Sequence, residues 1–175
     1  NTDAPGFLSD FNRFIANRKS EIINPKSALV LGAGGSACAV VYALLHDGWN
    51  VTVSSRRPEQ AGQLAASFLN YQLQITDFAD LRPFTFHLIV NTTPLGMTPN
   101  IDSSPLPEGT NLTQGTIVYD LVYNPRETKL VRDAKTQGCH ATTGLGMLIE
   151  QAALSFQLWT GRVPPREALY QSVSP

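Results

Sequence analysis

The sequence has few charged residues, and neither sign dominates. Only 15% of the 175 residues are Asp, Glu, Lys or Arg, against about 25% in ordinary soluble domains. Thirteen Lys and Arg stand against fourteen Asp and Glu, which gives a formal net charge of −1. The chain therefore lacks the basic surface that nucleic acids or anionic membranes attract, and neither is expected as a partner. The low charge indicates many buried strands, or a surface covered by something outside these residues.

Cysteine and long apolar runs are scarce too. Cys38 and Cys139 lie far apart in apolar contexts, which predicts two buried, reduced thiols in a cytoplasmic protein. No apolar run is long enough to span a membrane, and no signal peptide is visible. The three histidines share no ligand spacing, so no metal site is predicted. The first residue is Asn1 rather than Met, and we expect the chain to be a piece of a longer protein.

A glycine-rich turn is the most informative feature present. The apolar run 28–31 ends at Gly32-Ala33-Gly34-Gly35-Ser36-Ala37, and small apolar residues follow with helical spacing. Gly32, Gly34 and Ala37 fit G-x-G-x-x-G/A, in which the small residues permit a tight turn, the approach of a pyrophosphate, and close helix packing. The helix N-terminus adds unpaired N–H groups. A dinucleotide site is predicted; a glycine-rich turn in another α/β protein is the alternative.

Strands and helices alternate along the chain. Apolar periodicity predicts strands at 28–31, 51–53, 71–75, 86–90, 117–122 and 139–142, and helices at 6–17, 37–47, 58–68, 127–137, 147–159 and 164–170. A turn is predicted at 24–26, and 94–115 is the longest irregular stretch. This alternation predicts an α/β fold, a single three-layer domain with a Rossmann-type, doubly wound parallel sheet in the order 3-2-1-4-5-6.

The end of the second strand distinguishes between dinucleotides. NAD sites place an Asp or Glu there to bind the ribose 2′-hydroxyl, whereas this chain has Ser55, Arg56 and Arg57 and no acid before Glu59. Guanidinium groups offer a fixed fork of donors to phosphate oxygens. We therefore predict NADP as the cofactor, held by these three residues; a solvated basic turn is the alternative.

Polar residues also follow later strands. Asn91, Thr92 and Thr93 come after the fourth strand, at the switch point where ligands bind, although turn residues at a strand end are equally expected. Asp120 lies in an apolar run and would be costly to bury without partners. Tyr123 is interpreted first as a packing residue with a wet hydroxyl, and a substrate contact is the alternative.

In combination these motifs make nearly the whole chain resemble the shikimate dehydrogenase family. The segments that carry the resemblance are Asn1-Thr2-Asp3 with Gly6, the glycine turn 32–37, Asn91-Thr92-Thr93 with Gly96-Met97, Tyr119-Asp120 with Tyr123-Asn124-Pro125, and Gly144-Leu145-Gly146-Met147-Leu148 with Gln151. The resemblance implies NADP-dependent reduction of 3-dehydroshikimate to shikimate, in the pathway to aromatic amino acids.

The resemblance also implies roles for individual residues. Asp3 would work in catalysis with an essential lysine, which such enzymes carry in an N-terminal substrate domain that these residues do not include. Asn1, Tyr123 and Gln151 would contact the substrate. Met147 and the Gly144 backbone would lie against the nicotinamide, and Leu121 would also contact the cofactor.

We accordingly expect three parts. Residues 1–25 form a hinge and a linking helix from the N-terminal domain, 26–143 the NADP-binding Rossmann domain, and 144–175 the C-terminal helices that close the interdomain side. Arg57 resembles the quinate/shikimate branch, so an enzyme that uses NAD or NADP is an alternative, as is a stand-alone NADP-binding module without catalysis. The oligomeric state is left open, with a homodimer as one option.

Overall fold

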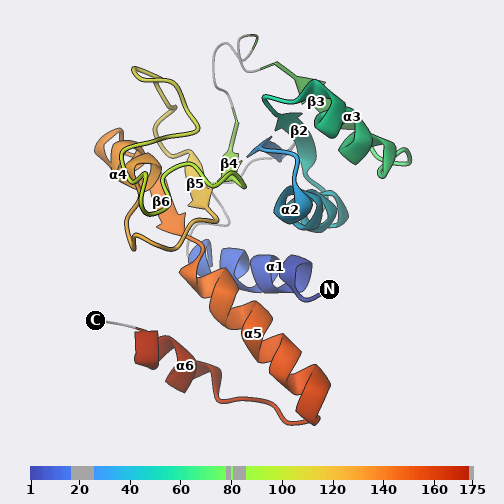
Figure 1. Ribbon diagram of the computed structural model, residues 1–175, viewed down its shortest axis with the longest axis vertical. Helices are drawn as coiled ribbons and strands as arrows, with labels where there is room; N and C mark the ends of the chain where they lie inside the picture. The colour runs from blue at the N-terminus through green and yellow to red at the C-terminus, as the bar shows by residue number, and fades with distance from the viewer. Residues whose placement is uncertain (17–25, 78–79, 81–85, 174–175) are drawn as a thin grey trace.

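The computed structural model describes residues 1–16, 26–77, 80 and 86–173, and contains one six-stranded sheet (Figure 1). Every neighbouring pair is parallel, and the order is β3-β2-β1-β4-β5-β6. The predicted fold class and strand order are therefore confirmed. The strands are β1 (Ser27–Leu31), β2 (Asn50–Ser54), β3 (Leu73–Thr76), β4 (Leu88–Asn91), β5 (Ile117–Asp120) and β6 (His140–Thr143).

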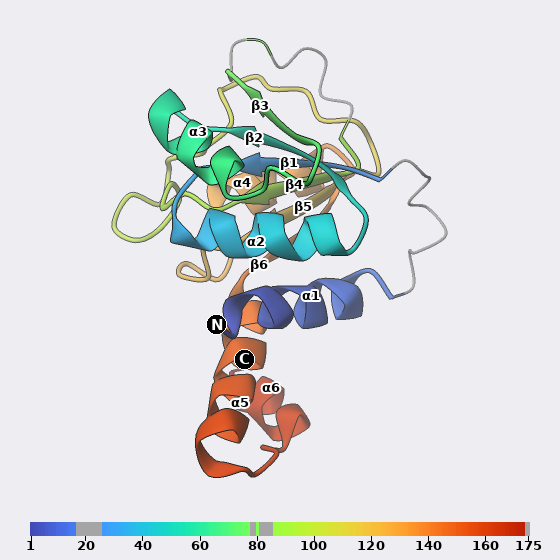
Figure 2. The same ribbon diagram turned by 90° about the vertical axis from the view of Figure 1, so that its right-hand side faces the viewer.

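Helices cover both faces of the sheet and make a three-layer domain. They are α1 (Asp3–Phe14), α2 (Gly35–His46), α3 (Pro58–Ala66), α4 (Lys129–Thr136), α5 (Leu145–Thr160) and α6 (Arg166–Val173). Apolar residues of α1, α2 and α3 share one buried cluster with the sheet. Residues of α4, together with Leu106 and Leu112 of the long loop, form the second cluster. Figure 2 shows α1 and α2 below the strands, and the two clusters place α4 on the other face of the sheet.

The strands read as continuous apolar runs because both faces are buried. In β1, Ala28 and Val30 point into the cluster under α1 and α2, whereas Leu29 and Leu31 point into the cluster under α4. This alternation is the two-residue period of a strand. The apolar run that precedes the glycine turn is thus fixed from both sides, which holds the start of the turn in place.

The helix α1 packs on the sheet and is crossed by α5. Phe7 and Phe11 on α1 stack on each other and meet the ring of Tyr119 on β5 edge-on. At Gly6, an added Cβ would lie 2.9 Å from the Cβ and the backbone nitrogen of Gln151 on α5. Only a glycine lets the two helices cross so closely. Beyond the crossing, α5 extends away from the sheet, and α6 runs back alongside α5 (Figures 1 and 2).

The structure corrects the sequence expectations at a few points. Cys38 is exposed rather than buried, because it shares the outward face of α2 with Tyr42, four residues on, while Cys139 is buried as predicted. Predicted ends of strands and helices move by up to three residues; β5 ends at Asp120 instead of residue 122. Residues 24 and 25 of the predicted turn, and residues 17–25 and 174–175 of the expected outer parts, lie outside the described residues.

The turn after β1 gives a first prediction. Gly32 has φ +109°, and an added Cβ would lie 2.5 Å from Thr92 Oγ1, so Gly32→Ala should lower the free energy of unfolding by roughly 1–3 kcal/mol. Gly62 on the exposed face of α3 is the matched control, since nothing lies within 4 Å of its added Cβ. Gly62→Ala should instead raise stability, by up to about 1 kcal/mol. Urea unfolding of both variants checks the pair, and equal effects would contradict the strain at Gly32.

Candidate functional site

The parallel sheet gathers the predicted cofactor residues at one edge. The segments that follow β1, β2, β4, β5 and β6 all leave from the carboxyl ends of their strands, the side on which open α/β sheets bind ligands. We call this side the carboxyl edge. It carries Gly32–Ala37, Ser55–Arg57, Thr92–Thr93, Leu121–Tyr123 and Gly144–Met147.

The glycine turn leaves the start of α2 open. The N–H of Gly32 donates to the carbonyl of Ser54 at 2.8 Å, which ties the turn to the end of β2. Gly34 is the N-cap of α2 and no side chain caps it. An added Cβ at Gly34 or Gly35 would meet no atom within 4 Å. The first N–H groups of a helix lack partners within the helix, so this exposed turn fits a pyrophosphate.

The end of β2 supplies positive charge beside that turn. The side chains of Arg56 and Arg57 are exposed, and neither forms an ion pair with any described residue. The Ser55 hydroxyl oxygen accepts the N–H of Arg57 at 3.2 Å, which shapes the bend after the strand. Two guanidinium groups and no carboxylate at this position fit a 2′-phosphate better than a free 2′-hydroxyl.

Asn91 organises the turn after β4 from inside the protein. Its side chain is wholly buried; the amide nitrogen donates to Asp120 Oδ1 at 2.8 Å and to the Leu95 carbonyl at 3.3 Å. The amide oxygen accepts the N–H and the hydroxyl of Thr93, at 2.9 and 2.7 Å. All its polar side-chain atoms are therefore engaged within the chain. Thr92 and Thr93 are only half-buried, and a contact of any of the three with the cofactor stays a prediction.

Asp120 is buried with the partners that its burial requires. Its carboxylate accepts from the Asn91 amide, from the N–H of Val122 at 3.0 Å and from the Thr128 hydroxyl at 2.6 Å. The Thr128 hydroxyl oxygen in turn accepts the N–H of Val131 and caps α4. Burial raises the pKa of Asp120 above its usual value, and the three hydrogen bonds oppose that shift. One carboxylate thus joins β4, β5 and α4 directly below the carboxyl edge.

This shift predicts a pH dependence of stability. Because the pKa of Asp120 is higher in the folded chain than the ordinary value of 3.8, the folded state keeps this proton longer as the pH rises. The free energy of unfolding should therefore fall, relative to Asp120→Asn, as the pH rises from about 3.8 through the raised value. Above that window the difference should be constant. Guanidinium unfolding of both proteins from acid to neutral pH checks this prediction. A free energy of unfolding that rises with pH, relative to that of Asp120→Asn, would contradict it.

Asn1, Asp3 and Gln151, three of the residues with predicted catalytic or substrate roles, lie on or just before the two helices that cross at Gly6. The Asn1 amide oxygen accepts the N–H of Asp3 at 2.7 Å, and Asp3 lies half-buried in the first turn of α1, where the helix dipole favours an acid. Gly6, less than one helical turn later, touches Gln151 on α5. Tyr123, after β5, is 46% exposed and is therefore not the packing residue of our first interpretation. Its side chain is free to contact a substrate.

Leu121, Gly144 and Met147 are brought together at the other end of the site. An added Cβ at Gly144 would lie 2.4 Å from the Leu121 carbonyl oxygen, so the chain entering α5 passes directly against the end of β5. Met147 is buried in the same cluster as Phe7 and Tyr119. Among the predicted cofactor residues, these three lie farthest from Arg56 along the strand order.

Sequence reasoning missed a buried polar network behind these residues. The Tyr119 hydroxyl donates to Asp10 Oδ2 at 2.5 Å, and the Tyr170 hydroxyl lies 3.3 Å from Asp10 Oδ1 and 3.1 Å from Glu150 Oε1. Burial raises the pKa of Asp10, and burial with the Asp10 charge raises that of Tyr119. The signal was in the helical spacing, because Asp10 lies three and four residues from Phe7 and Phe14, on the apolar face of α1.

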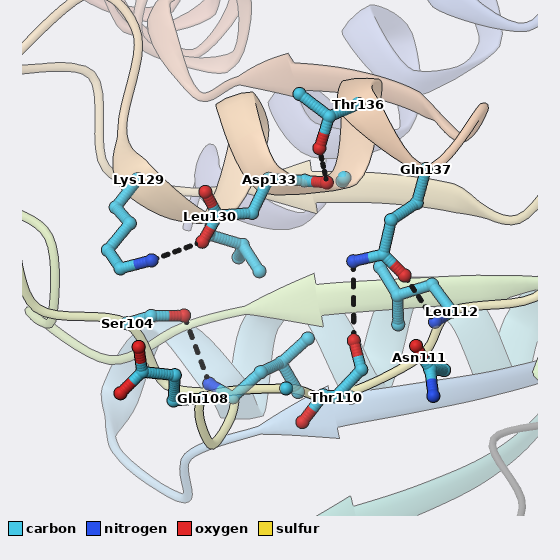
Figure 3. Close-up of a pocket in the computed structure, with 13 residues that line it drawn as sticks. Ser104, Glu108, Thr110, Asn111, Leu112, Lys129, Leu130, Asp133, Thr136 and Gln137 are labelled. Atoms are coloured by element: carbon cyan, nitrogen blue, oxygen red, sulfur yellow. Dashed lines mark hydrogen bonds and ion pairs between the residues drawn. The ribbon is translucent and has the colours of Figure 1, made fainter.

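Two hollows are lined by residues that the structure describes. One, of about 490 Å³, is lined by Asn1, Gly35 and Tyr42 among others, between the starts of α1 and α2. The other, of about 240 Å³, lies between the loop 104–112 and α4. Figure 3 shows that several of its polar groups pair with one another: Lys129 is paired to Asp133, and the Gln137 amide donates to the Thr110 carbonyl at 3.2 Å. The exposed side chains of Glu108 and Asn111 also line this second hollow, and none of the predicted site residues does.

Among the residues that the structure describes, no three His, Cys, Asp or Glu side chains come together as metal ligands. Within the same residues, every helix is too short or too polar to cross a membrane.

An all-parallel sheet in this order, with a glycine turn after β1 and open helix N–H groups, defines a Rossmann-type NAD(P)-binding domain. The sequence profile of shikimate / quinate 5-dehydrogenase matches residues 14–127, and that of the shikimate 5′-dehydrogenase C-terminal domain matches 144–173. The chain belongs to the shikimate / quinate 5-dehydrogenase family, as the motifs predicted.

Individual relatives agree with this assignment. The chain is 41% identical to the shikimate dehydrogenase (NADP(+)) of Salinibacter ruber, over 99% of its own length and 62% of that protein. It resembles the Thermus thermophilus enzyme crystallised with NADP(H) and shikimate, at 38% identity and a TM-score of 0.80 over 98% of this chain and 60% of that one. It also resembles the quinate dehydrogenase of Corynebacterium glutamicum in complex with NAD, at 30% identity and a TM-score of 0.85 over 98% and 61%. The chain thus spans about three fifths of these relatives.

Proposed function

We propose that this chain is the NADP(H)-binding part of an oxidoreductase that reduces 3-dehydroshikimate to shikimate. The observation that carries the proposal is the pair of exposed arginines, Arg56 and Arg57, beside an open glycine turn at the same edge of the sheet. Named relatives that bind NADP(H) and shikimate support it. The reaction belongs to the synthesis of aromatic amino acids, and a cytoplasmic location stays a prediction.

The strand order gives the direction in which the cofactor would lie. Arg56 follows β2, the glycine turn follows β1, and Gly144 follows β6 at the far edge. The 2′-phosphate would bind at Ser55, Arg56 and Arg57, and the pyrophosphate at the turn. The nicotinamide would then reach Leu121, Gly144 and Met147. We accordingly keep 26–143 as the cofactor domain, 1–25 as the link to a substrate domain, and 144–175 as the helices that face that domain.

When bound, NADPH supplies the hydride that reduces the carbonyl carbon of the substrate. The carbonyl oxygen must gain a proton at the same time, which requires a positioned acid within hydrogen-bond reach. Asp3, with the lysine of a substrate domain, is our candidate for that proton transfer. Gln151 on α5 packs against Gly6 of α1, three residues after Asp3, and Tyr123 is exposed after the end of β5. Both can donate hydrogen bonds to substrate hydroxyls, as can Asn1.

The arginine assignment predicts a loss of binding that depends on the 2′-phosphate. Arg56→Ala should raise the Kd for NADP+ and for 2′,5′-ADP roughly ten- to a hundredfold, the worth of one or two charged hydrogen bonds. The Kd for NAD+ should stay the same, because it lacks that phosphate. The matched control is Arg132→Ala, which removes one positive charge from the exposed face of α4 instead of from the end of β2. Isothermal titration of the three ligands checks this, and unchanged NADP+ binding would exclude the phosphate contact.

A polypeptide limited to these 175 residues should bind the cofactor and yet turn over shikimate very slowly. Lys26, Lys129 and Lys135 are each tied to an acid, in ion pairs with Asp47, Asp133 and Glu127. None of them is in the context of the family's essential lysine, and Lys19 lies outside the described residues. A steady-state assay with shikimate and NADP+ tests the expectation, and a rate like that of the full-length relatives would contradict it.

Quinate oxidation with NAD+ is the second candidate. Arg57 and the likeness to an NAD-bound quinate dehydrogenase favour it. The ratio of Kd values for NAD+ and NADP+ in the unmodified chain separates the two readings. A preference for NADP+ of tenfold or more, about 1.4 kcal/mol, supports the first proposal, and equal affinities support the second.

A further inference from the structure

The start of α5 is held by a buried hydrogen bond from outside its own helix. Tyr119 on β5 and Asp10 on α1 lie 109 residues apart in the sequence, and their side chains meet at 2.5 Å. Tyr119 is fully buried and Asp10 is 8% exposed. A hydrogen bond to a charged group is worth more than a neutral one, and in a buried site each partner would be costly to leave unpaired.

The first turn of α5 rests directly on this pair. An added Cβ at Gly146 would lie 1.9 Å from Asp10 Oδ1, so the carboxylate packs against the backbone of that turn. The Met147 backbone also adjoins the Tyr119 hydroxyl, where it opposes the rise in the pKa of that group. On the other side, Gly144 packs on the Leu121 carbonyl. The turn 144–147 is thus clamped between the end of β5 and α1.

A second layer of contacts supports Asp10 from the side of α6. The Tyr170 hydroxyl bridges Asp10 and Glu150, the Arg13 guanidinium lies 3.6 Å above the Tyr170 ring, and Arg166 pairs with Glu150 at 3.0 Å. These contacts orient the Asp10 carboxylate toward the start of α5. The network meets the carboxyl edge at the first turn of α5, where Asp10 packs on Gly146, so it acts through α5.

We propose that Asp10 and Tyr119 are positioning residues, which set the height and rotation of the first turn of α5 and thereby the nicotinamide half of the bound cofactor. The inference rests on the proposed function, because Gly144 and Met147 are its nicotinamide contacts. The adenosine half is held at β1 and β2, on the other side of the sheet centre, and does not depend on this clamp.

A pair of ligands tests the inference. NADP+ contains the nicotinamide and 2′,5′-ADP does not, while both carry the 2′-phosphate. In Tyr119→Phe and Asp10→Asn the Kd for NADP+ should rise about tenfold toward that for 2′,5′-ADP, and the Kd for 2′,5′-ADP should stay within about twofold. Tyr170→Phe, at the half-buried end of the network, should act in the same direction but less. The matched controls are Tyr71→Phe, on exposed surface, and Asp133→Asn, half-buried on α4 outside the network.

Methionine NMR gives a readout that does not depend on affinity. The chain has two methionines, Met97 and Met147, and Met97→Leu assigns the methyl signals. NADP+ should shift the Met147 methyl resonance more than 2′,5′-ADP does, and Tyr119→Phe should remove that extra shift. Thermal unfolding shows that each variant is folded, and Tyr170→Phe carries the test if the others are not.

The outcomes separate the inference from the function on which it rests. Equal weakening of both ligands, or no change in either, overturns the positioning role. The same holds if the unmodified chain binds NADP+ no more tightly than 2′,5′-ADP. If the unmodified chain binds neither ligand, the proposed function itself fails.

Discussion

Parallel pairing requires each strand to be followed by a crossover that returns the chain to the opposite end of the sheet. The parallel sheet therefore delivers the segments after β1, β2, β4, β5 and β6 to one edge, whatever their distance in the sequence. The glycine turn, the arginines after β2 and the turn after β4 are neighbours for this reason alone. The site is an outcome of topology first, and of side-chain chemistry second.

Two buried carboxylates then fix what the topology brings together. Asp120 ties β4 to β5 and α4, and Asp10 ties β5 to α1 and α5. Each has its pKa raised by burial, so each costs stability that apolar residues would not. Both lie just behind the carboxyl edge. Buried polar groups of this kind specify one arrangement of the elements around them, which a purely apolar core specifies less sharply.

Much of this fold could be predicted because its signals are local. The glycine turn, the apolar strands and the strand order depend on short stretches that alternate regularly, and these agree with the structure. Cys38 could not be placed, since an apolar helix such as α2 gives little sign of which face is outward. The Asp10–Tyr119 contact could not be found either. Its two halves carry weak local hints, an acid on an apolar helix face and a tyrosine in a strand, but only the folded chain pairs them.

The packing of α1 has a consequence for how the chain is made. Phe7 and Phe11 pack against Trp49 and Tyr119, and Thr2 meets Ser155 across 153 residues. Because synthesis runs from the N-terminus, α1 leaves the ribosome long before β5 and α5 exist. Contacts of such long sequence separation close late in folding. A nascent chain that has not yet reached β5 therefore carries an uncovered aromatic stripe, the kind of surface on which chaperones act.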